Sequence, residues 1–236
     1  MADKSTARTP RERVRVEMLQ EITEVARRHL ALSGPASLSL RAVARDVGVV
    51  SSAVYRYFPS RDELLTALII EAYDDLGATV EQAESAVRRR DLTERWRVIC
   101  TSVRRWAIEH PHEYGLLYGT PVPGYAARRR TITSAARVPN LMLALLADMT
   151  VAGQAPGKGP DAARVPRKVR ASIVSALAAV DGAVSPDLMA RGLIAWTWLY
   201  GAVSYELFGH LVGSVDAPDV FFDHQVDRMA RVVGVA

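Results

Sequence analysis

"LSLRAVARDVGVVSSAVYRYF", residues 38–58, contains two short helical patterns on either side of a glycine. Ser39 is a suitable N-cap for the first helix, and Ser51 is a candidate N-cap for the second. Gly48 lies between them, where a tight turn needs a positive φ. The apolar side chains are spaced so that one helix packs on the other: Leu40, Val43, Ala44, Val47, Val49 and Val54. This spacing predicts a helix-turn-helix.

A helix-turn-helix places its second helix in the major groove of DNA, while its first helix crosses the backbone. Small and aromatic side chains near the start of the second helix can reach base edges: Ser51, Ser52, Ala53 and Tyr55. Arg56, Tyr57 and Arg61 can donate hydrogen bonds to phosphates, which fixes register without reading sequence. The alternative is a surface hairpin whose tyrosines only pack against their neighbours.

The longer stretch 38–65, which continues with "PSRDELL", resembles the N-terminal signature of TetR-type transcriptional regulators. In that signature a Ser or Thr caps the second helix, Gly-Val forms the turn, and Tyr-x-(His or Tyr)-Phe ends the recognition helix. Val50 and Arg61 depart from it, because the family usually has serine and lysine there. The resemblance implies base contacts by Ser51, Ser52, Ala53 and Tyr55, and backbone contacts by Ser39, Arg56, Tyr57 and Arg61. It also implies an all-helical homodimer that releases DNA when a small molecule enters its C-terminal domain.

Positive charge is concentrated near the start of the chain. Residues 1–61 hold 11 basic and 6 acidic side chains, a net charge of +5, whereas the whole chain has +4. The remainder is therefore at −1, and the asymmetry indicates an anionic partner for the N-terminal quarter, with a solvated charged helix face as the alternative. A single cysteine, Cys100, excludes an intrachain disulfide, and the charged N-terminus lacks the apolar run of a signal peptide. We expect a cytoplasmic protein.

Apolar periodicity and Gly/Pro punctuation predict helices throughout and no sheet. Outside the helix-turn-helix, the expected helices span 14–30, 61–90, 92–110, 112–118, 125–152, 166–181, 186–213 and 218–233. Residues 1–11 should form a mobile basic arm and 153–166 a mobile loop. The predicted fold is all-α: an N-terminal three-helix helix-turn-helix DNA-binding domain in residues 1–60, followed by a larger helical ligand-binding and dimerisation domain in residues 61–236.

Two C-terminal segments resemble the ligand-domain subgroup named for a Trp-His-Gly pattern: "HPHEYGLLYGTPVPGY" (110–125) and "AWTWLYGAVSYELFGH" (195–210). Trp196 and Gly201 match, but Tyr200 replaces the histidine, so a role of that histidine does not transfer. Several large side chains could line a pocket for a largely apolar small-molecule effector: Trp106, Tyr114, Leu117, Tyr118, Tyr125, Trp198 and Phe208. Aromatic side chains at helical spacing also commonly form core, which is the alternative for each of them.

The expected helix 186–213 is too apolar to face water on every side. Hydropathy alone would allow a membrane span at 192–213, but Glu206 disfavours one. We therefore predict that this helix is buried against a second copy of the chain and against the helix at 166–181. The small residues that would allow close approach are Gly192, Ala195, Gly201, Ala202, Gly209 and Gly213.

These observations predict a one-component DNA-binding transcriptional regulator, a repressor that a small molecule releases from an inverted-repeat operator. The other hypothesis is a helical small-molecule-binding or enzymatic protein whose N-terminal hairpin is only structural. We expect no enzymatic activity and no cofactor. His110, His112 and Glu113 are loosely spaced around Pro111, which disfavours a metal site. Cys100 has no histidine near it in sequence and fits a buried, inert thiol.

Overall fold

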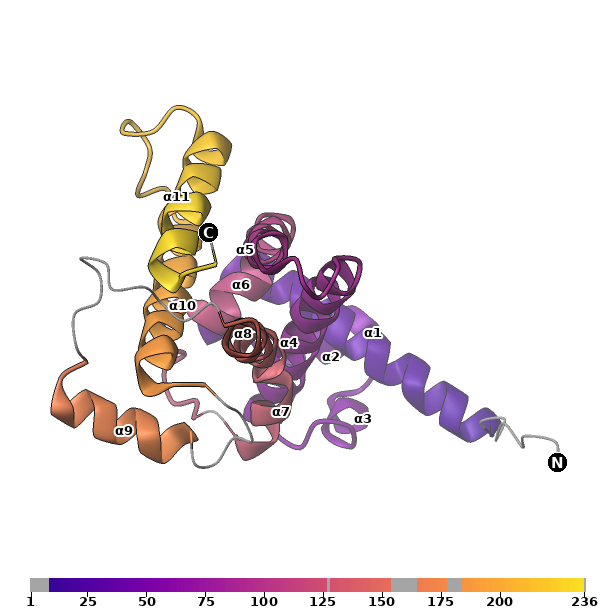
Figure 1. The fold of residues 1–236 in the computed structure, drawn as a ribbon. Helices are drawn as coiled ribbons and strands as arrows, with labels where there is room; N and C mark the ends of the chain where they lie inside the picture. Colours follow the sequence, from indigo (N-terminus) through magenta and orange to yellow (C-terminus); the bar gives the residue numbers. More distant parts are fainter. Residues whose placement is uncertain (1–8, 127, 154–164, 178–183, 236) are drawn as a thin grey trace, which may run out of the picture. The chain divides into compact units, whose positions relative to one another are not determined.

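The computed structural model describes residues 9–126, 128–153, 165–177 and 184–235, and these contain helices and turns but no strand (Figure 1). The all-α prediction is confirmed. The helices are α1 (Pro10–Ser33), η1 (Pro35–Ser37), α2 (Leu40–Val47), α3 (Ser51–Tyr55), α4 (Arg61–Ser85), α5 (Leu92–Glu109), α6 (Pro111–Tyr118), η2 (Arg129–Thr131), α7 (Ile132–Ala135), α8 (Arg137–Val151), α9 (Arg167–Leu177), α10 (Pro186–Leu207) and α11 (Pro218–Val233).

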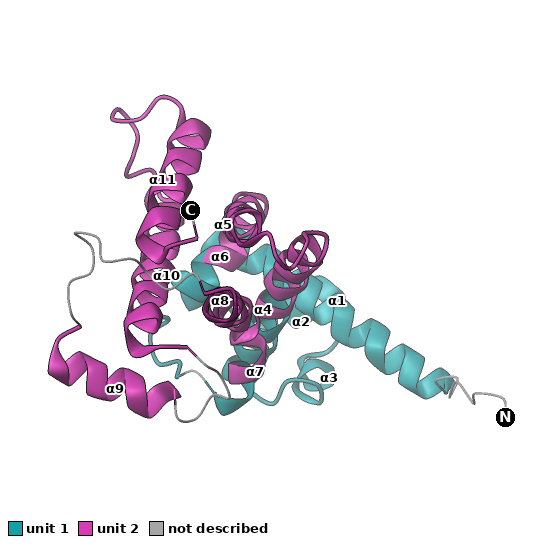
Figure 2. Ribbon diagram, in the orientation of Figure 1, with its two compact units in different colours: residues 1–72, 115–131 teal, residues 73–114, 132–236 magenta. Residues whose placement is uncertain are grey.

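The chain divides into two compact units (Figure 2). Unit 1 comprises residues 1–72 and 115–131, and unit 2 comprises residues 73–114 and 132–236. Unit 1 contains the region 1–60, which we expected to bind DNA, and adds the start of α4 and a segment that follows it by more than forty residues. Both α4 and α6 contribute residues to each unit.

Unit 1 is built on α1, which begins at Pro10 and ends before Gly34. Thr9 caps it: the Thr9 hydroxyl accepts from the Glu12 amide, and the Glu12 carboxylate accepts from the Thr9 amide. Gly34 has φ 71°, so the chain leaves α1 in a conformation that glycine favours. Pro10 and Arg11 were expected in a mobile arm and instead belong to this capped helix, whereas residues 1–8 lie outside the described residues.

The helix-turn-helix consists of α2, the turn at Gly48, and α3. Gly48 has φ 82°, which confirms the predicted left-handed turn. Val43 and Val54 are fully buried, so the two helices pack through the predicted apolar face. Ser39 occupies the N-cap of α2 but makes no capping hydrogen bond with its side chain. The cap prediction for Ser51 is wrong: Val50 occupies the N-cap, and Ser51 is the first residue of α3.

Unit 2 packs its helices around large buried side chains, among them Trp96, Trp106, Leu145 and Leu199. The indole of Trp96 donates to the carbonyl of Val226, which joins α5 to α11. Cys100 is fully buried in α5, and burial raises the pKa of its thiol well above the ordinary value. The predicted inert thiol agrees with this position.

Three helices differ in extent from the prediction for local reasons. The expected helix 125–152 begins only at Arg129, in the 3-10 turn η2. It is broken again at Ala136, because Pro139 lacks an amide donor and its ring conflicts with the carbonyl four residues earlier. α4 stops at Ser85, and Asp91 then caps α5 by accepting from the Glu94 amide. α10 ends at Leu207, where Gly209 follows with φ 78°. Most of the expected loop 153–166 lies outside the described residues.

Glu206, the acidic residue of the long apolar segment, lies in α10 and is one-sixth exposed, with a side-chain relative accessibility of 16%. Its carboxylate accepts two hydrogen bonds from the guanidinium of Arg104 in α5. Across the described part of the chain, no helix combines the length and the hydropathy that crossing a membrane would require.

Candidate nucleic-acid interface

The helix α3 has one buried face and one exposed face. Val54 is fully buried and Phe58, just after the helix, is 6% exposed, so these two side chains hold α3 against α1 and α2. The opposite face presents Ser52, Tyr55 and Arg56, all exposed, and Tyr55 keeps 42% of its surface accessible. These three side chains are therefore accessible to a partner.

The remaining predicted contact residues flank this face. Ser51, Ala53 and Tyr57 are partly exposed, and Ser39 is exposed at the start of α2. Because α3 has only five residues, its side chains are positioned mainly by the buried Val54 and by the turn that precedes them. All these residues belong to one helix-turn-helix within unit 1. Their contacts with DNA stay a prediction.

Arg61 differs from the other predicted phosphate ligands because its guanidinium is already engaged. It donates to the carbonyl of Pro35 at 2.8 Å and to that of Ala36 at 3.3 Å. Its side chain is 28% exposed, and its buried Nε atom has no hydrogen-bond partner among the residues that the structure describes. Arg61 therefore ties the start of α4 to the 3-10 turn after α1, whatever else it contacts.

His29 and Asp46 link α1 to the last turn of α2, just before the turn of the helix-turn-helix. The His29 ring nitrogen Nε2 lies 2.7 Å from a carboxylate oxygen of Asp46. This hydrogen bond, with a smaller contribution from Arg45, lowers the pKa of Asp46. The first helix of the motif is thereby fixed against the helix that supports it.

Residues 115–131 pack on the helix-turn-helix unit from far along the chain. Leu116, Val122 and Tyr125 contact its apolar core. The hydroxyl of Thr66 donates to the carbonyl of Asp62 at 2.6 Å, which leaves Tyr125 to donate to Thr66 at 3.1 Å. This long-range packing was not predicted, since no local periodicity signals it.

The carboxylate of Glu63 holds the end of this segment through two ion pairs, with Arg128 and Arg130. The three consecutive arginines at 128–130 were the one available signal, because such a basic cluster favours acidic partners. We call residues 115–131 the strap.

The residues predicted to line a ligand pocket do not form one group. Leu117, Tyr118 and Tyr125 belong to unit 1, whereas Trp106, Tyr114, Trp198 and Phe208 belong to unit 2. Within unit 2, Trp106 donates to Asp75 and stacks on His110, while Trp198 donates to Gln225 and stacks on Phe222.

Tyr114 and Phe208 do lie together, with ring centroids 6.3 Å apart. The buried hydroxyl of Tyr114 donates to the carbonyl of Tyr200 and lies 2.9 Å from the hydroxyl of Ser204. Burial raises the pKa of Tyr114 to about 12. Tyr200 stacks on Tyr114 and contacts Trp196, so an aromatic cluster joins α6 to α10.

Comparison with known proteins decides the family. Residues 22–68 match the model of bacterial regulatory proteins of the tetR family, and residues 96–229 match that of the tetracyclin repressor-like C-terminal domain. The chain belongs to the TetR family. It is 37% identical over 222 residues to the HTH-type transcriptional regulators Rv1816 of Mycobacterium tuberculosis and Mb1846 of Mycobacterium bovis, with 93% of each chain covered.

Solved structures agree with this assignment. The protein SCO4313 is 30% identical, and its crystal structure superposes with a TM-score of 0.75 over 94% of this chain and 98% of its own. The TetR-family regulator PfmR of Thermus thermophilus shares the fold, with a TM-score of 0.57, 19% identity, and coverage of 89% and 97%.

As a TetR-family protein, the chain is a helix-turn-helix DNA-binding transcriptional regulator. The hypothesis drawn from residues 38–65 is confirmed against the alternative of a purely structural hairpin. The resemblance to the Trp-His-Gly subgroup is not confirmed by the matched families. The C-terminal match also covers the strap, so part of the C-terminal family region folds within the DNA-binding unit.

Proposed function

We propose that this TetR-family regulator is a repressor that binds an inverted-repeat operator as a homodimer and leaves it when a small molecule binds the C-terminal region. The observation that carries the DNA-binding part is the two-sided α3. Val54 and Phe58 fix its inner face, while Ser52, Tyr55 and Arg56 remain exposed on the other. A recognition helix needs both faces: the buried face holds the helix in place, and the exposed face contacts base edges in the groove.

The chemistry of each exposed residue would decide whether it contacts base edges or phosphates. Ser51, Ser52, Ala53 and Tyr55 would meet base edges, where hydroxyl groups hydrogen-bond and apolar surface contacts thymine methyl groups. Ser39, Arg56, Tyr57 and Arg61 would hold phosphates and fix the register. Ser39 suits this role because its side chain makes no capping bond within the protein.

The homodimer would form through the outer face of α10. That face exposes Leu193, Ile194, Tyr205 and Phe208, and a side chain added at Gly201 would meet nothing within the protomer. Two of the small residues expected at the interface lie elsewhere: Ala195 is fully buried, and a Cβ at Gly192 would collide with Leu146. These two serve packing inside the protomer.

A largely apolar effector would be recognised within the C-terminal region. The cluster of Tyr114, Tyr200 and Phe208 joins α6 to α10, and α6 leads directly into the strap. The other predicted lining residues lie outside this cluster: Trp106 and Trp198 contact other side chains of unit 2, and the remaining three, Leu117, Tyr118 and Tyr125, belong to unit 1. We propose no enzymatic activity and no cofactor, and we place the protein in the cytoplasm because its target is the chromosome.

A footprint on duplex DNA from the chain's own promoter region tests the proposal. We expect two protected half-sites related by a two-fold axis, with centres about one helical turn, roughly 34–36 Å, or a small multiple of it apart. Tyr55→Ala should change which bases are preferred, whereas Arg56→Ala should weaken binding to all sequences and lower the salt dependence by about one unit of slope. Protection of a single unrepeated half-site would contradict the proposed dimeric operator.

A further inference from the structure

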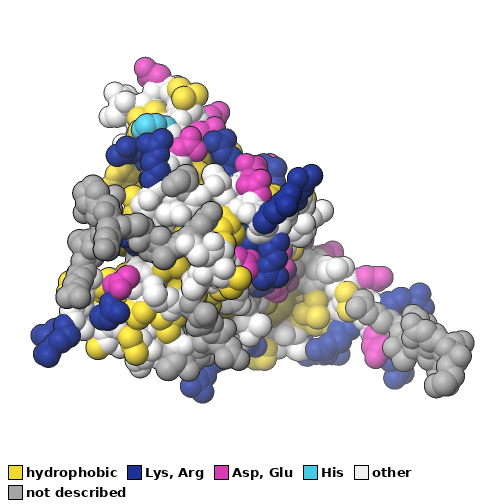
Figure 3. Space-filling model, in the orientation of Figure 1, with side chains coloured by type: hydrophobic (Ala, Val, Ile, Leu, Met, Phe, Trp, Pro, Cys, Tyr) yellow, Lys and Arg dark blue, Asp and Glu magenta, His cyan; other side chains and the backbone are white. Residues whose placement is uncertain are grey.

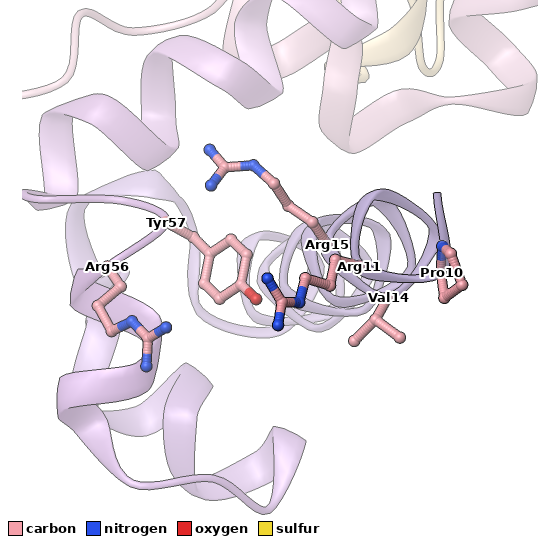
Figure 4. Close-up of a pocket in the computed structure, with 6 residues that line it drawn as sticks. All are labelled: Pro10, Arg11, Val14, Arg15, Arg56 and Tyr57. Atoms are coloured by element: carbon pink, nitrogen blue, oxygen red, sulfur yellow. The ribbon is translucent and has the colours of Figure 1, made fainter. Parts of the chain in front are cut away.

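A basic pocket lies beside the recognition helix in unit 1 (Figure 4). It has a volume of about 470 Å³, and its lining comes from the first turns of α1 and from the two residues that follow α3: Pro10, Arg11, Val14, Arg15, Arg56 and Tyr57. In Figure 4 the ring of Tyr57 is drawn between Arg56 and the arginines of α1. The guanidinium carbon of Arg15 lies 5.7 Å from the centre of that ring, a cation–π distance.

The arginines of this pocket have no acidic partner among the described residues. Salt bridges within 4.0 Å engage other arginines of unit 1: Arg27 pairs with Glu24 and Glu71, Arg45 with Asp46, and Arg128 and Arg130 with Glu63. None is formed by Arg11, Arg15 or Arg56 within the parts of the chain that the structure describes. Figure 3 shows basic side chains along the first turns of α1, at the right of the view; those of α1 are all arginines.

Glu12, the acidic residue in the same helical turn as Arg11, already accepts hydrogen bonds from Thr9. The Glu12 carboxylate accepts from the amide of Thr9 at 2.7 Å and from its hydroxyl at 2.9 Å, which completes the cap of α1. Arg11 lies in this first turn, where the helix dipole disfavours a cation. The arginines therefore do not stabilise α1, and three like charges around one pocket repel each other until an anion enters.

The geometry points to a phosphate seat: we propose that Arg11 and Arg15 of α1, together with Arg56 and Tyr57, bind one backbone phosphate of the operator DNA. A guanidinium offers planar paired donors that match phosphate oxygens, and the Tyr57 hydroxyl adds a further donor. Arg56 directly follows the recognition helix, so a phosphate held here borders the groove that α3 enters. Contacts of this kind set the register of α3 from outside the helix-turn-helix.

This inference rests on the proposed DNA binding and adds Arg11 and Arg15 to the residues that carry it. The test uses the full-length protein and the footprinted duplex, with the dissociation constant measured from low to moderate salt. The variants are Arg11→Ala/Arg15→Ala, the charge-preserving Arg11→Lys/Arg15→Lys, and the control Arg28→Ala. Arg28 is also an exposed arginine of α1 but lies outside the pocket lining. Circular-dichroism melting curves confirm that each variant is folded.

The second arm replaces single phosphates of the half-site with neutral methylphosphonates, one position at a time. Wild-type protein should lose affinity at several positions. At one of them the Arg11→Ala/Arg15→Ala protein should lose clearly less affinity than wild type, because only Arg56 and Tyr57 still hold that phosphate. Its salt slope should fall by about one unit, while Arg28→Ala keeps the wild-type slope. The double-lysine protein should keep the slope but bind more weakly, since lysine lacks the paired donors.

Two failures are distinguishable. If the wild-type protein binds and footprints its operator but the double-alanine protein matches it in slope and at every methylphosphonate position, the phosphate seat is wrong and the proposed function stands. If wild-type protein gives no footprint, the proposed operator binding fails first, and the seat with it.

Discussion

At the scale of single residues, Arg56 and Arg61 show why a shared charge does not mean a shared role. Both were predicted to hold phosphates, and both border the recognition helix. Arg56 is exposed and has no acidic partner among the described residues. Arg61 instead donates to the carbonyls of Pro35 and Ala36. The sequence reports the charge of each, but only the folded chain reports which guanidinium remains available.

Replacement of each arginine by alanine should separate the two roles. Arg61→Ala removes a donor from the carbonyls of Pro35 and Ala36, of which Pro35 keeps only the Leu38 amide, so we expect it to lower the free energy of unfolding by about 1–3 kcal/mol. Arg56→Ala should change it by less than about 0.5 kcal/mol, as is usual for an exposed side chain, while it weakens DNA binding. Urea unfolding followed by circular dichroism measures both. Equal stability of the two variants would show that the Arg61 contacts are not formed in solution.

At the scale of elements, a buried arginine joins three helices of unit 2. The Arg95 side chain on α5 is 4% exposed and donates to Glu84 at the end of α4 and to Asp148 on α8. Asp148 also accepts hydrogen bonds from the Nε and Nη2 groups of Arg89. Because a buried guanidinium is costly without its counter-charges, this network fixes where α4 ends.

Acid should weaken this network through Asp148. Its hydrogen bonds, with Arg89 first and Arg95 second, lower its pKa below the ordinary value. A carboxyl whose pKa is lowered on folding stabilises the protein above its unfolded pKa of about 3.9, and that contribution is lost as the pH falls through the folded value. Asp148→Asn should therefore cost about 3 kcal/mol at pH 7, and the difference from wild type should shrink below about pH 4. Unfolding titrations at a series of pH values measure this, and a difference independent of pH would contradict it.

The strap gives a second test at this scale. Glu63→Gln removes the ion pairs with Arg128 and Arg130, so residues 128–131 should exchange their amide hydrogens faster, while unfolding costs only about 0.5–1 kcal/mol less. Glu71→Gln is a matched control, because it breaks an ion pair with Arg27 in the same unit. Hydrogen exchange read by mass spectrometry should show no change at the strap in that control.

Local sequence patterns predicted the helices well, whereas contacts between residues distant in the sequence could not be predicted. Ser39, Gly48 and the spacing of Val43 and Val54 located the helix-turn-helix because each acts within a few residues of itself. Pro139 was visible in the sequence, yet the apolar pattern around it outweighed its effect on α7 and α8. The strap and the pocket of Arg11 and Arg15 depend on residues brought together from distant positions, which periodicity does not record.

At the scale of the whole molecule, the outer face of α10 argues for a second subunit. Leu193, Ile194 and Tyr205 of α10, and Phe208 directly after it, expose between 44% and 59% of their surface. Large apolar side chains exposed on one face of a helix are typical of an interface. A two-fold axis through this face would present the same side chains from both copies, and the bare backbone at Gly201 would let the helices approach closely.

A charge placed on either side of α10 should distinguish interface from core. Ile194→Glu puts a carboxylate on the exposed face, where it should prevent association but leave the protomer folded, because glutamate there stays solvated. Ala195→Glu, one residue later, places the same charge on the fully buried inner face and should unfold the protein.

Sedimentation at micromolar concentration should find wild type as a dimer and Ile194→Glu as a folded monomer of 25.8 kDa. The monomer should bind the operator far more weakly, since each copy then reads one half-site alone. A wild-type monomer with full operator affinity would overturn the dimer, and an Ile194→Glu dimer would move the interface away from α10.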